Sequence, residues 1–310
     1  MTYEEKKSLL KDRIDALAAG NTVLAFSGGV DSALLLSLLK ESSDRSGTEV
    51  LPVTFHTFLH PAVDMEAAES FCREMNTSHR ILSVDEMENP AIAENPKDRC
   101  YLCKKMLFGK LWDLAAAAGI PAVIDGTNLD DTKVYRPGLR ALSELGIISP
   151  LKDVGFTKED VRRLAGERGL SVSRRPSSPC LATRFPYDTH LTREMLALAE
   201  RGEAVLGRYL SGNLRLRIHG SLARIEADPD QFPKLLEARE EITKALKDLG
   251  LQYITLDLSG FHSGSYDLTD SRLARESCAP RAGCRKASNT NQHACASSRS
   301  VYLSGRLDPH

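Results

Sequence analysis

Two glycines and an aspartate interrupt a hydrophobic segment near the N-terminus. The stretch VLAFSGGVDSALLLSLL (23–39) is an apolar run, a short polar break and a second apolar run with helical spacing. A strand that turns into a helix here would leave backbone N–H groups at the positive end of the helix dipole, and Gly28 and Gly29 would let a ligand approach closely. This pattern predicts an anion site; a strand-to-helix turn that happens to contain glycines is the alternative.

The other side chains of this loop favour a polyphosphate ligand. The hydroxyls of Ser27 and Ser32 can donate hydrogen bonds to phosphate oxygens. Asp31 would be repelled by a polyphosphate unless Mg²⁺ lies between them, so it is a candidate magnesium ligand. The loop has neither the GK[ST] ending of a Walker motif nor the GxGxxG of a dinucleotide-binding loop.

A C-x-x-C motif follows about 70 residues later, in DRCYLCKK. Cys100 and Cys103 at this spacing can converge on one metal or cluster, or can form a redox pair. A zinc ribbon would need further ligands, and the sequence has no second C-x-x-C. The motif alone therefore leaves its chemistry open.

A third cysteine lies in a long irregular stretch that is rich in Ser, Pro and Arg. Cys180 has Arg174, Arg175 and Arg184 nearby in sequence. If these cations face the thiol, they lower its pKa and make it a nucleophile near neutral pH, with Cys180 and Arg184 as the candidate catalytic residues. A buried structural cysteine is the alternative, although such cysteines usually lie in apolar runs.

Composition excludes a global attraction to polyanions. The 310-residue chain has 41 Lys+Arg and 42 Asp+Glu, and its net charge of -1 gives no general drive toward nucleic acid or an anionic membrane. The N-terminal segment is a charged amphipathic helix pattern without a signal core, and no apolar run has membrane-spanning length. We expect a cytoplasmic protein with no membrane partner, in which the seven cysteines stay reduced.

Hydrophobic periodicity predicts an α/β fold for residues 1–175. Expected strands at 22–26, 50–57, 79–84 and 121–127 alternate with expected helices at 31–41, 62–75 and 102–118. This alternation is typical of a parallel sheet with helices on both faces. Gly126 ends the last of these strands, where it is a candidate nucleotide-binding residue. Asp130 and Asp131 follow it as candidate metal or adenylate contacts, unless they only cap a turn.

The pattern of helices and strands expected in residues 190–266 predicts a second, smaller α+β domain. A helix near 192–210, strands at 214–220 and 222–227, a helix near 230–249 and a strand at 252–258 form an α-β-β-α-β unit. Residues 267–310 show little periodicity, and we expect a disordered tail.

A pair of arginines in this second unit is a candidate phosphate clamp. Arg215 and Arg217 alternate with apolar residues and so lie on the same side of one strand, while Glu226 on the next strand can orient them or meet a substrate. A solvated strand face with ordinary ion pairs is the alternative.

The loop SGGVDS resembles the pyrophosphate-binding loop of the PP-loop ATP pyrophosphatases, which have the adenine nucleotide alpha hydrolase-like fold. Five further motifs, in order, resemble those of the LarE-type sulfur transferases within that superfamily. They are DGTNLDDTKVYRPGLRAL (125–142), SPLKDVGFTKEDVR (149–162), PSSPCLATRFPY (176–187), LRLRIHGSLARIE (214–226) and DLSGFHSGS (257–265). The resemblance covers nearly all of residues 5–266 and leaves the tail outside.

The resemblance implies an ATP-dependent sulfur insertase. Such proteins adenylate a carboxylate of pyridinium-3,5-biscarboxylic acid mononucleotide with MgATP and convert it to a thiocarboxylate for the nickel-pincer nucleotide of lactate racemase. It implies that Arg215, Arg217 and Glu226 bind this substrate at a subunit interface of a homo-oligomer. The three-cysteine form of the family implies a 4Fe-4S cluster on Cys100, Cys103 and Cys180, whose open iron carries the transferable sulfur; a lone-cysteine form sacrifices its own sulfur instead.

Two other functions use the same loop. A PP-loop tRNA thiolase also pairs adenylation with cysteines, but it predicts a basic RNA-binding surface, which the net charge does not favour. A nucleotide-binding assembly module without turnover would bind ATP and release no pyrophosphate.

Overall fold

The computed structural model describes residues 1–133, 136–174, 179–262 and 266. Contacts group Met1–Tyr266 into one compact unit. The expected disordered tail at 267–310 lies outside the described residues, as does part of the segment between the two expected domains. Within the described ranges, every helix is too short or too polar to cross a bilayer.

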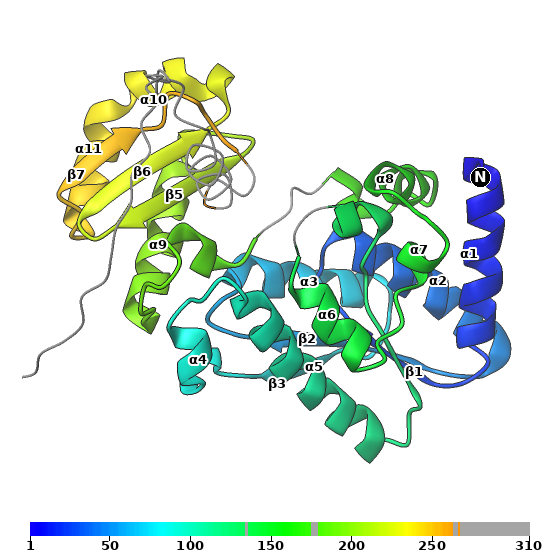
Figure 1. Cartoon of the computed structure of the whole chain (residues 1–310). Coiled ribbons are helices and arrows are strands. Elements are labelled where there is room, and N and C mark those ends of the chain that lie inside the picture. Colours follow the sequence, from blue (N-terminus) through cyan, green and yellow to red (C-terminus); the bar gives the residue numbers. More distant parts are fainter. Residues whose placement is uncertain (134–135, 175–178, 263–265, 267–310) are drawn as a thin grey trace, which may run out of the picture. The chain divides into compact units, whose positions relative to one another are not determined.

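A four-stranded parallel sheet organises the first half of the chain (Figure 1). Its strands are β1 (Thr22–Ala25), β2 (Val50–His56), β3 (Arg80–Ser83) and β4 (Ala122–Ile124), in the order β3-β2-β1-β4. In the centre of the sheet, Val23 of β1 is in register with Leu51 on one side and Val123 on the other. The predicted parallel α/β sheet is confirmed.

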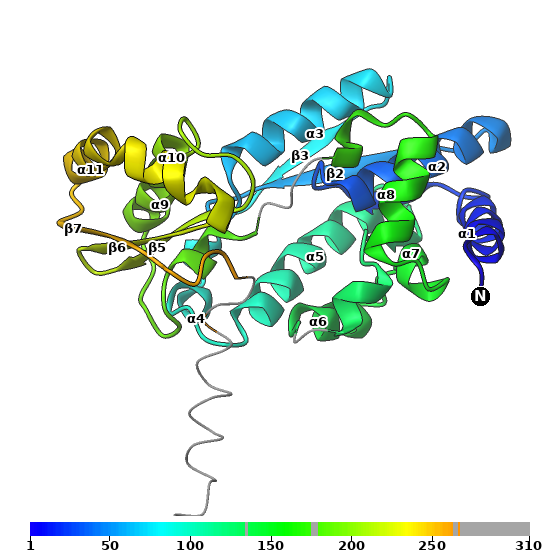
Figure 2. The ribbon, with the colours of Figure 1, turned by 90° about the horizontal axis from the view of Figure 1, so that it is seen from above.

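Helices cover both faces of this sheet, and the alternation of side chains along the strands assigns each helix to a face. Val23, Val53 and Val123 pack in one hydrophobic cluster with α5 (Arg99–Ala117). Leu24, Val50 and Ile124 pack in another, with helices α1 (Tyr3–Leu17), α2 (Val30–Ser46), α3 (Ala62–Glu74) and α8 (Lys158–Glu167). Figure 2 shows α3 and α5 as separate layers beside the strands.

Short elements connect these layers. They are η1 (Glu86–Glu88), α4 (Pro90–Ala93), η2 (Leu129–Lys133), α6 (Gly138–Glu144), α7 (Pro150–Asp153), η3 (Ser171–Arg174) and η4 (Leu181–Arg184). Sequence periodicity did not predict them, because elements of three to seven residues are too short for a helical pattern.

A three-stranded sheet organises the second half. Strands β5 (Leu214–His219), β6 (Leu222–Ala227) and β7 (Tyr253–Leu256) lie in the order β5-β6-β7, with β5 and β6 antiparallel and β6 and β7 parallel. The helices are α9 (Arg193–Leu206), α10 (Phe232–Glu237) and α11 (Arg239–Asp248), with η5 (Pro229–Gln231) before α10. The predicted α-β-β-α-β order is correct. The prediction of one helix near 230–249 is wrong, because the chain leaves helical geometry at Ala238, between α10 and α11.

Candidate functional site

The glycine loop between β1 and α2 has the geometry of an open anion site. Gly28 has a φ of 70°, and a Cβ on it would lie 2.9 Å from the backbone nitrogen of Ala68 in α3. Only glycine fits such a position without strain. Helix α2 begins after Gly29 with no hydrogen bond from a capping side chain, so the dipole end of the helix is not closed by a side chain.

The predicted serines and Gly126 lie at the same place. The hydroxyl of Ser32 donates to the carbonyl of Gly29 at 3.1 Å and lies 3.3 Å from the hydroxyl of Ser27. A Cβ on Gly126, just after β4, would lie 3.1 Å from the backbone nitrogen of Ser32 and 3.3 Å from Cβ of Asp31. The absence of a side chain at Gly126 therefore lets the end of β4 approach the start of α2.

The carboxylate of Asp31 has two protein partners. Asn128 donates from its side-chain amide to Oδ1 at 3.1 Å, and the ammonium group of Lys158 forms an ion pair with Oδ2. Lys158 is the first residue of α8, which starts with the capping box of Thr157 and Asp160. No pattern in the sequence singled out Asn128 or Lys158, although both lie in the motifs at 125–142 and 149–162.

The carboxylates of Asp130 and Asp131 accept hydrogen bonds from backbone amides. Oδ2 of Asp130 accepts from the backbone N–H of Lys158 at 2.8 Å, and Oδ2 of Asp131 accepts from that of Asn128 at 3.0 Å. These are turn and capping contacts, the alternative that the sequence had left open.

The three candidate cysteines differ in exposure. Cys100 is exposed and Cys103 is buried, one helical turn apart at the start of α5, and Cys180 is partly buried just before η4. Burial raises the pKa of the Cys103 thiol, and the charges of Cys180 and Cys100 add to this effect. Among the described residues, however, no three Cys, His, Asp or Glu side chains are arranged to hold a metal ion.

The predicted low pKa of Cys180 is wrong. Burial raises the pKa of this thiol, and Arg99, not Arg184, is the cation that opposes the rise. The guanidinium of Arg184 turns to Glu203 at 2.8 Å and donates to the carbonyls of Pro179 and Cys180 at 3.1 and 3.3 Å. It therefore binds the backbone near the thiol and is neutralised by a carboxylate. The side chains of Arg174 and Arg175 lie outside the described residues.

The Cys180 segment contacts the edge of the sheet that carries the glycine loop. The backbone N–H of Leu181 donates to the carbonyl of Leu59 at 2.8 Å, in the connection that follows β2. Because β1 and β2 are parallel neighbours, their carboxyl ends meet at one edge. Cys180 therefore lies toward the same edge as the glycine loop.

A buried carboxyl group also belongs to this region. Glu86, in η1 after β3, is 0 % exposed, and hydrogen bonds from its own backbone, the Thr57 side chain and the backbone of Phe58 lower its pKa less than burial raises it. Burial raises the pKa of Glu86 to about 7, and its charge contributes to the raised pKa of Cys103 and Cys180. No sequence motif pointed to it.

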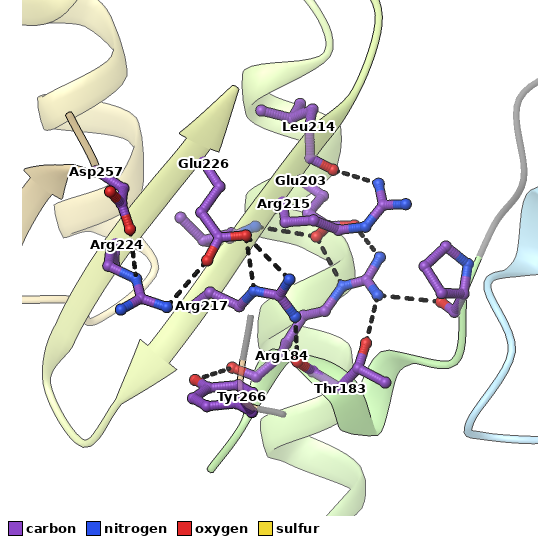
Figure 3. A network of polar contacts seen from close by, with 12 residues as sticks. Thr183, Arg184, Glu203, Leu214, Arg215, Arg217, Arg224, Glu226, Asp257 and Tyr266 are labelled. Carbon is purple, nitrogen blue, oxygen red and sulfur yellow. Dashed lines mark hydrogen bonds and ion pairs between the residues drawn. The ribbon is translucent and has the colours of Figure 1, made fainter. Parts of the chain in front are cut away.

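Arg217 is paired inside the second sheet (Figure 3). Its guanidinium donates through Nε and Nη2 to Oε2 of Glu226 at 3.1 and 2.9 Å, while Nη1 donates to the carbonyl of Thr183. Arg224 binds the other oxygen of Glu226 at 2.9 Å and lies near Asp257 at 3.6 Å. The forked donors of Arg217 that were predicted to clamp a phosphate are therefore already used on a carboxylate.

Arg215 is more accessible than Arg217. Its guanidinium donates to the carbonyl of Leu214 and lies 5.2 Å from the centre of the Phe261 ring. Burial, together with the positive charges of Arg184 and Arg217, lowers the pKa of Arg215 to about 10. Crowding of positive charge at this point favours an anionic ligand.

Comparison with known proteins agrees with this geometry. A family model described as a PP-loop domain matches residues 2–102. The pyridinium-3,5-bisthiocarboxylic acid mononucleotide synthase of Lactiplantibacillus plantarum is 36% identical over 275 residues, which are 88% of this chain and 98% of that protein. An uncharacterized protein of Synechocystis is 36% identical over 78% of this chain and 90% of its own length. One of Methanocaldococcus jannaschii is 34% identical over 85% of this chain and its own full length. The chain therefore belongs to the LarE family of PP-loop, ATP-dependent sulfur transferases.

Proposed function

We propose that the chain adenylates a carboxylate of pyridinium-3,5-biscarboxylic acid mononucleotide and converts it to a thiocarboxylate, a step in making the nickel-pincer nucleotide of lactate racemase. The observation that carries this proposal is the near full-length similarity to a relative whose name specifies the corresponding bisthiocarboxylic product. The reaction has three requirements, which are a nucleotide site, a sulfur source and an acceptor site, and the described residues offer a candidate for each.

The nucleotide half uses the open glycine loop. We assign Ser27, Gly28, Gly29, Ser32 and Gly126 to the ATP phosphates, since the start of α2 offers N–H donors without a capping side chain. Asp31 fits a magnesium ligand by its carboxylate and its place in the first turn of α2. When bound, Mg²⁺ would neutralise charge on the phosphates. The ion pair with Lys158 must then open, which would leave the Lys158 ammonium group available for a phosphate oxygen.

The sulfur half uses the cysteines near the Leu59–Leu181 contact. Cys100, Cys103 and Cys180 fit a 4Fe-4S cluster in number and type of ligand, although they are not arranged as a metal site in the described structure. When bound, such a cluster would offer an open iron for a transferable sulfide. Without a cluster, Cys180 itself would be the sulfur source. Both routes require an anionic sulfur to attack the carbonyl carbon of the adenylate, with AMP as the leaving group. In the Cys180 route this attack gives a thioester, and loss of the Cα proton with cleavage of the Cβ–Sγ bond would then release the thiocarboxylate and leave dehydroalanine at this position.

The acceptor half uses the arginine network. In the part of this network that the structure describes, four arginines face three carboxylates, so that part carries excess positive charge. The arginines are Arg184, Arg215, Arg217 and Arg224, and the carboxylates are Glu203, Glu226 and Asp257. We assign the phosphate of the acceptor to Arg215, with Arg217 held in place by Glu226. A homo-oligomer whose interface completes this site, and a cytoplasmic location, are part of the same proposal.

Product analysis tests the proposal. The chain, purified anaerobically, is incubated with MgATP and the biscarboxylate nucleotide, and pyrophosphate, AMP and the mass of the nucleotide are measured. Pyrophosphate release with replacement of oxygen by sulfur in the nucleotide is the expected result. Sulfur found in tRNA but not in the mononucleotide would favour a tRNA thiolase, and ATP binding without pyrophosphate release would favour an assembly module.

A further inference from the structure

The parallel sheet has an open edge at β3. Among the described strands, β3 has β2 as its one neighbour, since the order is β3-β2-β1-β4. The backbone N–H of Val84, just after β3, donates to the carbonyl of His56 in β2 at 3.0 Å. Because the backbone groups of successive strand residues point to alternate sides, the N–H and C=O of Ile81 point away from β2. Such outward groups are a template for pairing with another strand.

The side chains of β3 do not protect this edge. Ile81 is 44% exposed, although it lies inside the strand. The strand contains no proline, and its register with β2 runs from Arg80 to Ser83 without a bulge. Proline and bulges are among the devices that keep an edge strand from pairing. The backbone of β3 can therefore accept a partner strand.

A hollow beside β3 contains charges of both signs. It has a volume of about 460 Å³ and is lined by residues of β2, β3 and α5. These include Arg80 and Leu82 of β3 and Lys110, Asp113 and Leu114 of α5. Among the residues that the structure describes, neither Arg80 nor Asp113 has an ion-pair partner. The hollow thus combines apolar walls with an uncommitted cation and an uncommitted carboxylate.

A second copy of this chain is complementary to both features. If two β3 strands pair antiparallel about a two-fold axis at Ile81, the two Ile81 residues lie opposite each other and exchange both N–H···O=C bonds. The same register sets Arg80 of one copy opposite Leu82 of the other, on the same face of the sheet. Arg80 of the second copy then enters the hollow that Leu82 and Asp113 line. Lys110 is exposed and can keep its ammonium group in water.

We propose that β3 is a self-association edge, which pairs antiparallel with β3 of a second copy about Ile81, while Arg80 of each copy forms an ion pair with Asp113 of the other. A second copy is the partner because the strand, the exposed Ile81 and the opposite charges complement themselves under one two-fold axis. The two four-stranded sheets then join into one. The interface proposed at the arginine network belongs to the other sheet, so the two interfaces can be tested separately.

The subunit number of the full chain tests the proposal. Sedimentation velocity at micromolar concentration should give an even number of copies for the wild type. Ile81→Lys sets two ammonium groups opposite each other and should halve this number. Leu236→Lys, at a leucine of α10 that is 54% exposed, is the matched control and should leave it unchanged. A monomeric wild type, or a folded Ile81→Lys protein with the wild-type subunit number, would overturn the proposal.

Charge reversal separates the proposed ion pair from general disruption of the edge. Arg80→Glu and Asp113→Arg each bring like charges together across the interface and should raise the dissociation constant by about tenfold. The double variant restores opposite charges and should return to within about threefold of the wild type. A double variant as weak as the single variants would refute the pairing of Arg80 with Asp113.

Ile81→Cys gives a readout of position. Opposed residues of a hydrogen-bonded antiparallel pair have Cα atoms about 5.5 Å apart, a separation that a disulfide spans. We expect mild oxidation to yield a peptide that joins residue 81 of two copies, and Leu236→Cys should give no corresponding product. A disulfide between residue 81 and a cysteine of residues 267–310 in its place would show that the tail occupies this edge, and would overturn the proposal.

Discussion

Lys158 and Asp31 form an ion pair that joins the first residue of α8 to the first turn of α2. Both side chains are partly exposed, so the pair contributes about 1 kcal/mol or less to stability. We assign the pair a functional role, because it neutralises the carboxylate that we assign to magnesium.

Replacing Asp31 with Ala should abolish ATP-dependent pyrophosphate release and leave the fold intact. The expected loss of activity is at least about a hundredfold, because the metal contact disappears, and the free energy of unfolding should change by about 1 kcal/mol or less. A pyrophosphate assay and urea unfolding measure the two effects. Release at the wild-type rate would contradict the assignment of the nucleotide site.

Substitutions of the neighbouring Gly28 and Gly29 by Ala should differ in their cost to stability. Gly28→Ala places a Cβ 2.9 Å from the backbone of Ala68 at a positive φ, so we expect it to cost roughly 1–3 kcal/mol of stability and to distort the loop. Gly29→Ala meets only the Ser27 hydroxyl at 3.4 Å and should cost less than about 1 kcal/mol. Similar urea midpoints for the two variants would refute this difference.

Glu86 predicts a specific dependence of stability on pH. Its pKa is raised from 4.5 to about 7 in the folded chain, so the folded state keeps a proton that the unfolded state has already lost. The stability from this group is fully present below about pH 4.5 and is lost as the pH rises through about 7, by on the order of 3 kcal/mol.

Glu86→Gln stays neutral and should escape this loss. Urea unfolding at about pH 5 and pH 8 should show the variant gaining stability relative to wild type at the higher pH. Glu88→Gln, on the exposed side of η1, is the control. If the free energy of unfolding changed equally with pH in wild type and Glu86→Gln, the carboxyl group of Glu86 would not have the raised pKa.

Arg215 and Arg217 should respond differently to truncation. Arg217→Ala leaves Glu226, which is 1 % exposed, with one cation fewer, and we expect a loss of about 2–3 kcal/mol in stability. Arg215→Ala should cost about 1 kcal/mol or less in stability but weaken acceptor binding by on the order of 1.5–3 kcal/mol, since Arg215 lies where the positive charges of Arg184 and Arg217 crowd and favour an anionic ligand. Unfolding curves and the acceptor KM separate the two. Loss of ATP affinity in Arg215→Ala, with the acceptor KM unchanged, would show that the two halves of the site were assigned in reverse.

Features of the fold that depend on residues adjacent in the sequence could be predicted. The strand-glycine-helix transition at Gly28 depends on neighbouring residues, so it could be predicted from the sequence. The parallel sheet followed from hydrophobic periodicity, and its order β3-β2-β1-β4 places the glycine loop on a central strand.

Long-range pairing could not be predicted in this way. Arg184 was predicted to lower the pKa of Cys180 because the two residues are close in sequence, but its guanidinium forms an ion pair with Glu203 on α9. Arg99 lies directly before Cys100, and that adjacency was the one signal that could have identified it. Its burial and its hydrogen bond to Asn95 depend on the packing of Asn95 against the chain near Pro186, which no local pattern encodes.

The mass of the nucleotide product tests the central claim most directly. The chain is incubated anaerobically with MgATP and pyridinium-3,5-biscarboxylic acid mononucleotide, with Asp31→Ala as the control. We predict a product in which sulfur replaces a carboxylate oxygen, formed together with AMP and pyrophosphate and absent from the control. Pyrophosphate release by the wild type with an unchanged nucleotide mass, under conditions in which the protein retains its sulfur source, would contradict the account.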